Sequence, residues 1–149
     1  MESPFDHQYF MRKAFQEAEL AFEKNEVPVG AVIVINDKII ARAHNLTETL
    51  NDVTAHAEMQ AFTAAADFLG GKYLKKCTLY VTLEPCQMCA GASYWTQIDQ
   101  IVFGAFDPKR GYRHYQTTLH PKTKVIGGIL EKECGDLIKK FFIEKRNLN

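Results

Sequence analysis

Strand-like and helix-like segments alternate along this chain, and this alternation constrains the fold more than any other feature of the sequence. Residues 29–35 form a continuous apolar run of strand length, and Asn36 and Asp37 predict a turn into a second strand over residues 38–44. Further strands are predicted over residues 78–82, 100–104 and 124–126. The chain therefore has enough strand segments for a sheet of its own.

Helices are predicted between and beside these strands. The helical segments are residues 7–24 with Asp6 as N-cap, a helix from Thr54 or Asp52 to about Leu69, residues 86–96 with Pro85 in the first turn, and residues 130–146. The segments 45–54 and 105–120 are predicted to be loops. Strands separated by helices at this spacing favour an α/β layered fold with a partly parallel sheet.

Length and composition fit one folded domain spanning residues 1–149. Hydrophobic residues make up 46% of the chain, which is enough for a core without staples and argues against intrinsic disorder. Cys77 and Cys134 are expected to be small buried hydrophobic residues of that core. The longest apolar run, residues 29–35, is too short to cross a membrane, and residues 1–10 lack the features of a signal peptide. We therefore expect a cytoplasmic protein with no membrane partner.

The net charge is zero, with 18 basic and 18 acidic side chains, but the two signs are unevenly distributed. Residues 1–106 carry a net charge of −5, and residues 107–149 carry a net charge of +5. Such a basic segment is either a contact surface for a phosphate backbone or a solvated loop and helix face. Charge alone favours the solvated face.

His56, Glu58, Cys86 and Cys89 are the residues most directly connected with chemistry. They stand in two short motifs, His-Ala-Glu and Pro-Cys-x-x-Cys, each at the predicted start of a helix. Taken alone, the two cysteines are also compatible with a redox pair or with core residues, and the histidine with a helix cap. Together, the motifs match the H-x-E…P-C-x-x-C signature of zinc base deaminases.

The residue types in these motifs suit a catalytic zinc site. Zinc prefers nitrogen and sulfur donors, and a catalytic zinc has three protein ligands and leaves one position for water. His56, Cys86 and Cys89 supply three such donors, and the positive end of a helix dipole favours the thiolate form of a cysteine. Glu58, which follows His56 closely, is placed to accept a proton from the metal-bound water without being a ligand.

Longer segments of the chain also match a known family. They are Val-Pro-Val-Gly-Ala-Val at residues 27–32, Asn45, the segment 52–58, the segment 79–92 with Leu-Glu-Pro-Cys-x-Met-Cys-Ala-Gly-Ala, and residues 102–105 and 128–130. On these segments the chain resembles the zinc-dependent cytidine-deaminase-like superfamily and, within it, the bacterial tRNA-specific adenosine deaminases. The resemblance implies a three-layer α/β/α cytidine deaminase-like fold with a five-stranded mixed sheet, a homodimer, one Zn²⁺ per subunit and no organic cofactor.

The resemblance also implies a reaction and a division of roles. The expected reaction is hydrolytic deamination of adenosine to inosine at the wobble position, position 34, in the anticodon stem-loop of an arginine tRNA. His56, Cys86 and Cys89 would hold the zinc, a zinc-bound hydroxide would be the nucleophile, and Glu58 would be the proton shuttle. Asn45 matches a family asparagine that contacts the purine, although its residue type suits a turn-capping role equally well.

Further residues are expected near the substrate. Pro28 and Ala57 are candidates for contacts with the base. The candidate RNA contacts are the basic residues Lys109, Arg110, Arg113, Lys139, Lys145 and Arg146. The segment 108–115 departs from the family pattern and is expected to touch either the RNA or the partner subunit. Phe141 and Phe142, in the last helix, are expected to lie in the core.

Other functions stay open at this point. Tyr94 and Trp95, together with Asn51 and Asp52, are reminiscent of guanine deaminases of the same superfamily. The main alternative is therefore a free-base deaminase that acts on guanine or, next, on cytosine. A non-catalytic RNA-binding subunit is the other alternative, and the presence of Glu58 disfavours it. Similarity of fold alone does not decide among these functions.

Overall fold

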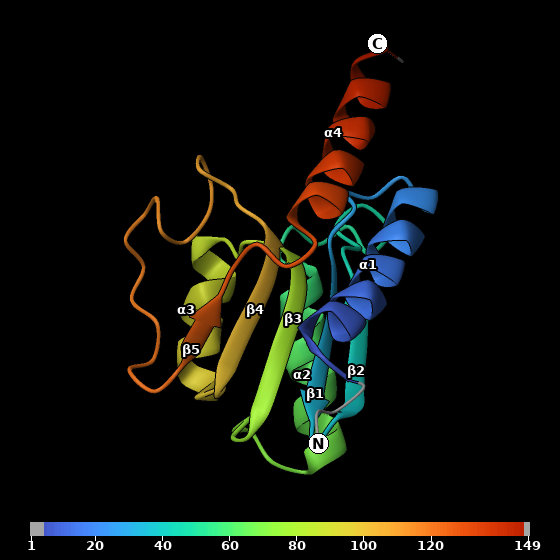
Figure 1. Cartoon of the computed structure of the whole chain (residues 1–149). Helices are drawn as coiled ribbons and strands as arrows, with labels where there is room; N and C mark the ends of the chain where they lie inside the picture. Colours follow the sequence, from blue (N-terminus) through green and yellow to red (C-terminus); the bar gives the residue numbers. More distant parts are fainter. Residues whose placement is uncertain (1–4, 148–149) are drawn as a thin grey trace.

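The computed structural model describes residues 5–147 and contains a five-stranded mixed sheet with helices on both faces (Figure 1). The strands are β1 (Gly30–Ile35), β2 (Lys38–His44), β3 (Cys77–Leu83), β4 (Gln100–Ala105) and β5 (Lys124–Ile126). The helices are α1 (His7–Glu23), α2 (Ala57–Leu69), α3 (Gln87–Thr96) and α4 (Glu131–Asn147). The predicted α/β fold with a five-stranded mixed sheet is confirmed.

The order and direction of the strands bring four strand ends to one edge of the sheet. The order is β2-β1-β3-β4-β5. β1 pairs antiparallel with β2, and Asn36 and Asp37 form the turn between them. Their φ angles of 50° and 59° belong to the left-handed region that tight hairpin turns require. β1 is also antiparallel to β3, whereas the β3–β4 and β4–β5 pairs are parallel. The start of β1 therefore lies beside the ends of β2, β3 and β4.

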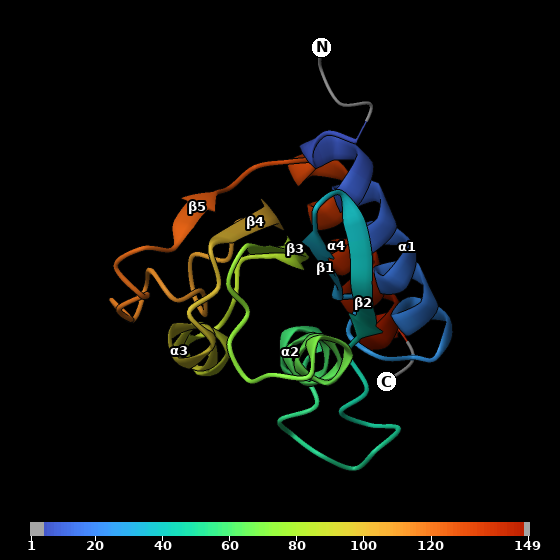
Figure 2. The ribbon, with the colours of Figure 1, turned by 90° about the horizontal axis from the view of Figure 1, so that it is seen from below.

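Two layers of helices enclose the sheet, as the end-on view shows (Figure 2). α2 and α3 lie on one face, and α1 and α4 lie on the other. Alternate residues of β1 enter the two cores: Ile33 belongs to the cluster that includes Phe62 of α2, and Val32 to the cluster that includes Phe10 of α1. α1 approaches β1 so closely that a Cβ at Gly30 would overlap the backbone of α1.

The starts of α2 and α3 differ from the prediction by a few residues. α2 begins at Ala57 with His56 as its N-cap, rather than with Thr54 or Asp52. The Asp52 carboxylate instead accepts hydrogen bonds from the Thr54 N–H (2.9 Å) and hydroxyl (2.8 Å), which closes a local turn ahead of the helix. α3 begins at Gln87, so the proline at position 85 precedes the helix and Cys86 is its N-cap. Both helices therefore start on a candidate metal ligand.

Two segments extend away from the sheet. The chain between β4 and β5 is irregular over most of its length, as predicted, and α4 projects beyond the sheet edge at which the strand ends gather (Figure 1). Cys134 of α4 and Cys77 of β3 are buried, which confirms that they are core residues. Within residues 5–147, no helix is long and apolar enough to cross a membrane.

Candidate active site

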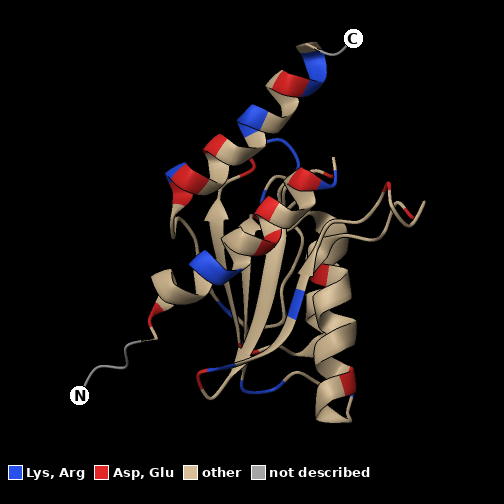
Figure 3. Cartoon of the chain, turned by 90° about the vertical axis from the view of Figure 1, so that its right-hand side faces the viewer, with Lys and Arg blue, Asp and Glu red and all other residues tan. Residues whose placement is uncertain are grey.

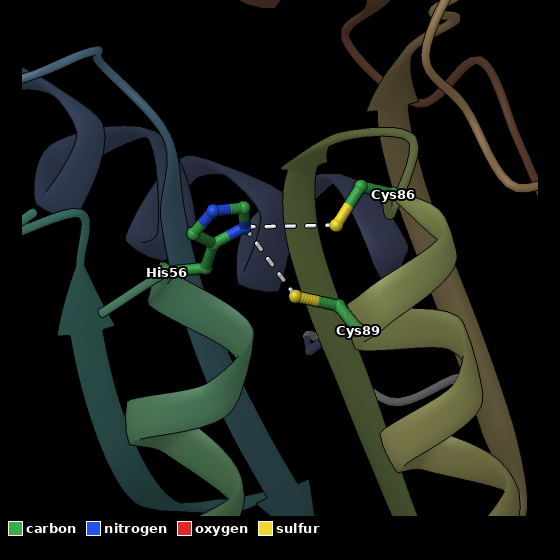
Figure 4. A group of neighbouring side chains, drawn as sticks. All are labelled: His56, Cys86 and Cys89. Atoms are coloured by element: carbon green, nitrogen blue, oxygen red, sulfur yellow. Dashed lines mark hydrogen bonds between the residues drawn. The ribbon is translucent and has the colours of Figure 1, made fainter. Parts of the chain in front are cut away.

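The N-termini of α2 and α3 meet at the sheet edge and bring His56, Cys86 and Cys89 together (Figure 4). The sulfur atoms of Cys86 and Cys89 each lie 3.6 Å from Nδ1 of His56. All three potential ligand atoms lie within 4.8 Å of one another. One imidazole nitrogen and two sulfurs at this spacing can hold a metal ion, as predicted from the two motifs.

His56 and Cys86 occupy cap positions without capping their helices. Neither side chain makes a cap hydrogen bond to its helix, so both are available to a ligand. At α2 the missing bond comes from Asn45, whose Oδ1 accepts a hydrogen bond from the Ala57 N–H at 2.8 Å. Asn45, at the end of β2, therefore caps the first N–H group of α2. The side chain of His56 is not needed for capping and can bind a metal ion.

The two cysteines differ in acidity. The pKa of Cys86 is lowered to about 4, chiefly by the hydrogen bond from the Cys89 thiol and then by the bond to His56. The pKa of Cys89 is raised, because its thiol donates to Cys86 and because it is buried. Cys86 therefore carries the negative charge of the pair, and a metal ion bound here would take both cysteines as thiolates, which are the ligand form of cysteine. The donor set fits a soft or borderline cation such as zinc.

Glu58 lies in the first turn of α2 and is only 4% exposed. Burial is the main cause that raises its pKa to about 7, and the charge of Cys86 acts in the same direction. A carboxyl group with a pKa near neutrality can both accept and release a proton. The environment of Glu58 therefore suits the predicted role as a proton acceptor beside the metal ligands.

A cavity of about 1100 Å³ lies over this cluster. His56, Glu58 and Cys86 form its floor, and Val27, Val29, Leu83 and Ala105 form an apolar wall. Its rim has three parts: the loop 47–53, the segment 106–110, and α4 with Gly135, Ile138, Lys139 and Phe142. The floor is therefore made by strand ends and helix starts, and the rim by loops and the projecting helix.

The predicted contact residues are divided between the cavity and its surroundings. Asn45, Lys109, Arg110 and Lys139 line the cavity. Pro28 and Ala57 do not line it: the first is buried between two wall residues, and the second is buried at the start of α2.

Three of the predicted RNA contacts lie outside the cavity. Arg113 donates Nη2 to Glu84 at 3.1 Å and Nε to the same carboxylate at 3.2 Å. The Nζ atom of Lys145 lies 5.6 Å from the centre of the Phe141 ring, and Arg146 is exposed near the end of α4. α4 carries both signs of charge along its length (Figure 3).

The expectation that both phenylalanines of α4 are core residues is wrong for one of them. Phe141 is 5% exposed, whereas Phe142 is 45% exposed and lines the cavity. Adjacent residues on a helix point about 100° apart, so only one of the two can face the sheet. The adjacency of the two phenylalanines in a predicted helix could therefore have shown that one of them lies outside the core.

Sequence reasoning also missed two buried carboxylates, Glu26 and Glu84, which are 0% and 2% exposed. Glu84 accepts a hydrogen bond from the Asp107 N–H at 3.1 Å besides its pairing with Arg113. A side chain at Gly111 would overlap the Glu84 carboxylate, so the glycine is needed for this close approach. Neither glutamate stands in a motif for metal binding, and nothing local in the sequence indicates that it holds a distant loop.

Comparisons with known proteins agree with this geometry. The family model of MafB19-like deaminases matches residues 5–149. A tRNA-specific adenosine deaminase of Bacillus subtilis is 49% identical over 143 residues, which cover 92% of this chain and 89% of the relative. A tRNA-specific adenosine deaminase of Aquifex aeolicus is 45% identical and covers 94% of this chain and 96% of its own length.

Solved structures point in the same direction. One, from work on A-to-I editing by tRNA:A34 deaminases, superposes with a TM-score of 0.80 and 42% identity, covering 87% of this chain and 98% of that one. A guanine deaminase of Bacillus subtilis superposes with a TM-score of 0.65 and 39% identity, covering 68% of this chain and 65% of that one. The fuller coverage and the higher score are with the tRNA branch, and the chain belongs to the family of tRNA-specific adenosine deaminases, within the cytidine-deaminase-like fold.

Proposed function

We propose that this chain, as one deaminase domain, hydrolyses adenosine to inosine and ammonia at the wobble position of a tRNA. The observation that carries the proposal is the cluster of His56, Cys86 and Cys89 beside the buried Glu58 at the floor of a large cavity. Its relatives are named for this reaction, and the structural match refers to A34 at the wobble position. The arginine tRNA expected as substrate stays a prediction.

One zinc ion per chain fits the donor set of one histidine and two cysteines. A zinc ion held there supplies an acidified water for attack on the base. The residues contribute more than ligand atoms. The thiolate of Cys86 is formed at the start of α3, where the positive end of the helix dipole favours it, and α2 presents its own positive end to the same place.

Glu58 moves the protons of the reaction. It accepts a proton from the attacking water and delivers it to N1 of the purine. It then takes the proton of the hydroxyl now bonded to C6 and passes it to the amino group, so that the C–N bond breaks, ammonia leaves and the C6 carbonyl of inosine forms. One carboxyl group can serve both steps because its pKa, at about 7, lies close to the working pH. Burial also keeps bulk water from exchanging that proton during the reaction.

Asn45 is proposed to orient the base. Its Oδ1 is occupied by the Ala57 N–H, so Nδ2 is the group that is left for a ligand. The Asn45 Nδ2 group can therefore donate to an acceptor nitrogen of a purine. The apolar wall residues Val29 and Leu83 suit the faces of a flat base.

The rim supports a polynucleotide partner, the anticodon stem-loop. The cavity, at about 1100 Å³, lies at the upper end of the range of ligand pockets and has room for more than one base. Lys109, Arg110 and Lys139 add positive charge at its mouth, and Phe142 adds an exposed aromatic face. An unstacked anticodon base also needs less energy to enter a pocket than a base in a duplex. This partner implies a cytoplasmic protein.

A homodimer belongs to the same proposal. Trp95 on α3 is 77% exposed, and Val53 in the rim loop is 82% exposed. Val53 lines the cavity, so the support for a subunit contact comes from Trp95, because an exposed tryptophan is typical of protein interfaces. The mass of the particle in solution at micromolar concentration, which equals one or two chains, tests this part directly.

A free guanine deaminase is the second candidate, because a guanine deaminase is 39% identical over part of this chain. The two functions are separated by assaying ammonia release from the zinc-loaded protein on two sets of substrates. One set is an anticodon stem-loop with adenosine at position 34 and its guanosine-substituted control. The other set is free guanine, cytosine, adenine and adenosine. We expect inosine only in the adenosine stem-loop; guanine or cytosine turnover with an unmodified stem-loop would replace the proposal by the free-base function.

A further inference from the structure

Glu26 is a buried carboxylate for which the reaction has no use. It lies between the end of α1 and the wall residue Val27, and its side chain is 0% exposed. Among the ion pairs of residues 5–147, none involves Glu26. A buried charge without a cation needs strong hydrogen bonds, since its desolvation is otherwise very unfavourable.

The hydrogen bonds to Glu26 all come from one short stretch of the rim loop. Oε1 accepts from the Glu48 N–H at 3.0 Å and from the Thr47 hydroxyl at 3.4 Å. Oε2 accepts from both the N–H and the hydroxyl of Thr49, each at 2.6 Å. Burial acts to raise the pKa of Glu26, but these bonds outweigh it and hold the pKa below its usual value. The carboxylate is therefore an anion held by the backbone of the loop.

Besides Glu26, the His56 side chain also holds this loop, through a hydrogen bond to the backbone of Val53. The loop extends away from the sheet beyond α2 (Figure 2), and its apolar side chains Leu50 and Val53 are 55% and 82% exposed. Hydrogen bonds within the loop, such as Asp52 N–H to the Thr47 carbonyl at 3.0 Å, fix its shape but not its position. Glu26 therefore holds residues 47–49 of the loop, whereas His56 holds the loop at Val53.

We propose that Glu26 is a positioning residue: it holds the loop 47–53 at the mouth of the cavity. In that position the loop can contact the nucleotides on either side of the reactive base. Thr47, Glu48 and residues 51–53 of the loop line the cavity, whereas Glu26 itself does not. No hydrogen bond joins Glu26 to the metal-binding cluster or to Glu58 within the described residues. The role rests on the proposed function. Because the bond between Val53 and His56 does not involve Glu26, we expect loss of the Glu26 bonds to affect substrate binding more than the chemical step.

The test compares Glu26→Gln with the matched control Glu17→Gln. Glu17 is a carboxylate of α1 that contacts His44 and no part of the rim loop. In Glu26→Gln an amide NH₂ faces backbone N–H donors, so the loop is released. We expect amide hydrogen exchange in residues 47–53 to rise about tenfold, the effect of weakening one hydrogen bond to a charged group, with exchange in α2 and zinc content unchanged. For the stem-loop with adenosine at position 34, KM rises about tenfold and kcat stays within about threefold.

Thr49→Val provides a milder variant, because it removes one hydroxyl donor and keeps both backbone bonds to Glu26. It should raise hydrogen exchange in the loop and KM for the stem-loop by a smaller factor than Glu26→Gln does.

The proposal is overturned if loop exchange is unchanged in Glu26→Gln, if Glu17→Gln has the same effects, or if kcat falls while KM does not change. Failure of the wild type to modify the stem-loop would instead overturn the proposed function, and the exchange measurement would still decide whether Glu26 anchors the loop.

Discussion

The floor and the rim of the cavity are built in different ways. The three floor side chains, His56, Glu58 and Cys86, stand at the starts of α2 and α3, and Glu58 is buried, as is the neighbouring Cys89. The rim is made of loops and an exposed helix, and most of its side chains face solvent. Residues on packed helices hold reacting groups more accurately than residues on loops, whereas loops vary with the partner. The comparison suggests that the floor decides the reaction and the rim decides the substrate.

The two rim loops also differ from one another. Glu26 holds the loop 47–53 through neutral donors, and Glu84 holds the segment 107–113 through a guanidinium and two backbone N–H groups. The first loop contributes Glu48 and Asp52 to the rim, and the second contributes Lys109 and Arg110. The mouth is therefore acidic on one side and basic on the other, so we expect the phosphates of the RNA on the basic side and bases, rather than phosphates, against the loop 47–53.

The largest effect is expected at the metal ligands of the floor. Cys86→Ala removes one of three donors, so we expect loss of stoichiometric zinc and of all measurable turnover, because affinity depends on the complete ligand set. Cys77→Ala is the matched control, since Cys77 is a buried cysteine outside the cluster. Metal analysis of both purified variants checks the ligand set, and stoichiometric zinc in Cys86→Ala would contradict it.

Glu58→Gln tests the floor without removing a ligand. We expect kcat to fall by about 10²- to 10⁴-fold, the usual contribution of a positioned acid and base, with zinc content and stem-loop affinity retained. Metal analysis, stem-loop binding and single-turnover rates on one preparation measure the three quantities. Turnover near the wild-type rate would exclude the proton-transfer role of Glu58.

The sequence was a good guide to the floor and a poor guide to the rim. The His-Ala-Glu and Pro-Cys-x-x-Cys motifs identified the cluster because each motif lies within one helix start. Thr54 and Asp52 were both predicted as possible caps from their residue types, but they bond to each other, and the Ala57 N–H at the helix start is bonded to Asn45 instead. Glu26 was missed because its partners lie 21 to 23 residues further along the chain, where no local pattern indicates them.

A smaller effect is expected from the basic side of the rim. The double variant Lys109→Ala/Arg110→Ala should bind the stem-loop about tenfold more weakly at low salt, because two exposed charge contacts are lost. The slope of log affinity against log salt should become shallower by about two, and single-turnover kcat should not change. Lys72→Ala/Lys75→Ala, which removes two exposed lysines outside the cavity, should match the wild type. An unchanged salt slope in the first variant would place the RNA elsewhere.

The smallest effect concerns stability and pH at the loop anchor. The pKa of Glu26 in the folded protein lies below its ordinary value of 4.5. Its contribution to stability is therefore complete above about pH 4.5 and is lost as the pH falls through the folded pKa. Urea unfolding of the wild type and of Glu26→Gln should differ most at neutral pH and converge in acid. A difference that grows as the pH falls has the opposite sign and would refute the anchor.

The most direct test of the division between floor and rim is the ratio of kcat/KM for two substrates with the same reactive base. One is free adenosine, and the other is the stem-loop with adenosine at position 34, both measured with the zinc-loaded wild type. If the rim decides the substrate, the stem-loop should be preferred by at least about a thousandfold, since several contacts of about 1.4 kcal/mol each contribute a factor of ten. That preference should decline as salt rises, while the rate on free adenosine stays constant. Equal values for the two substrates, or a preference that salt does not change, would contradict the account.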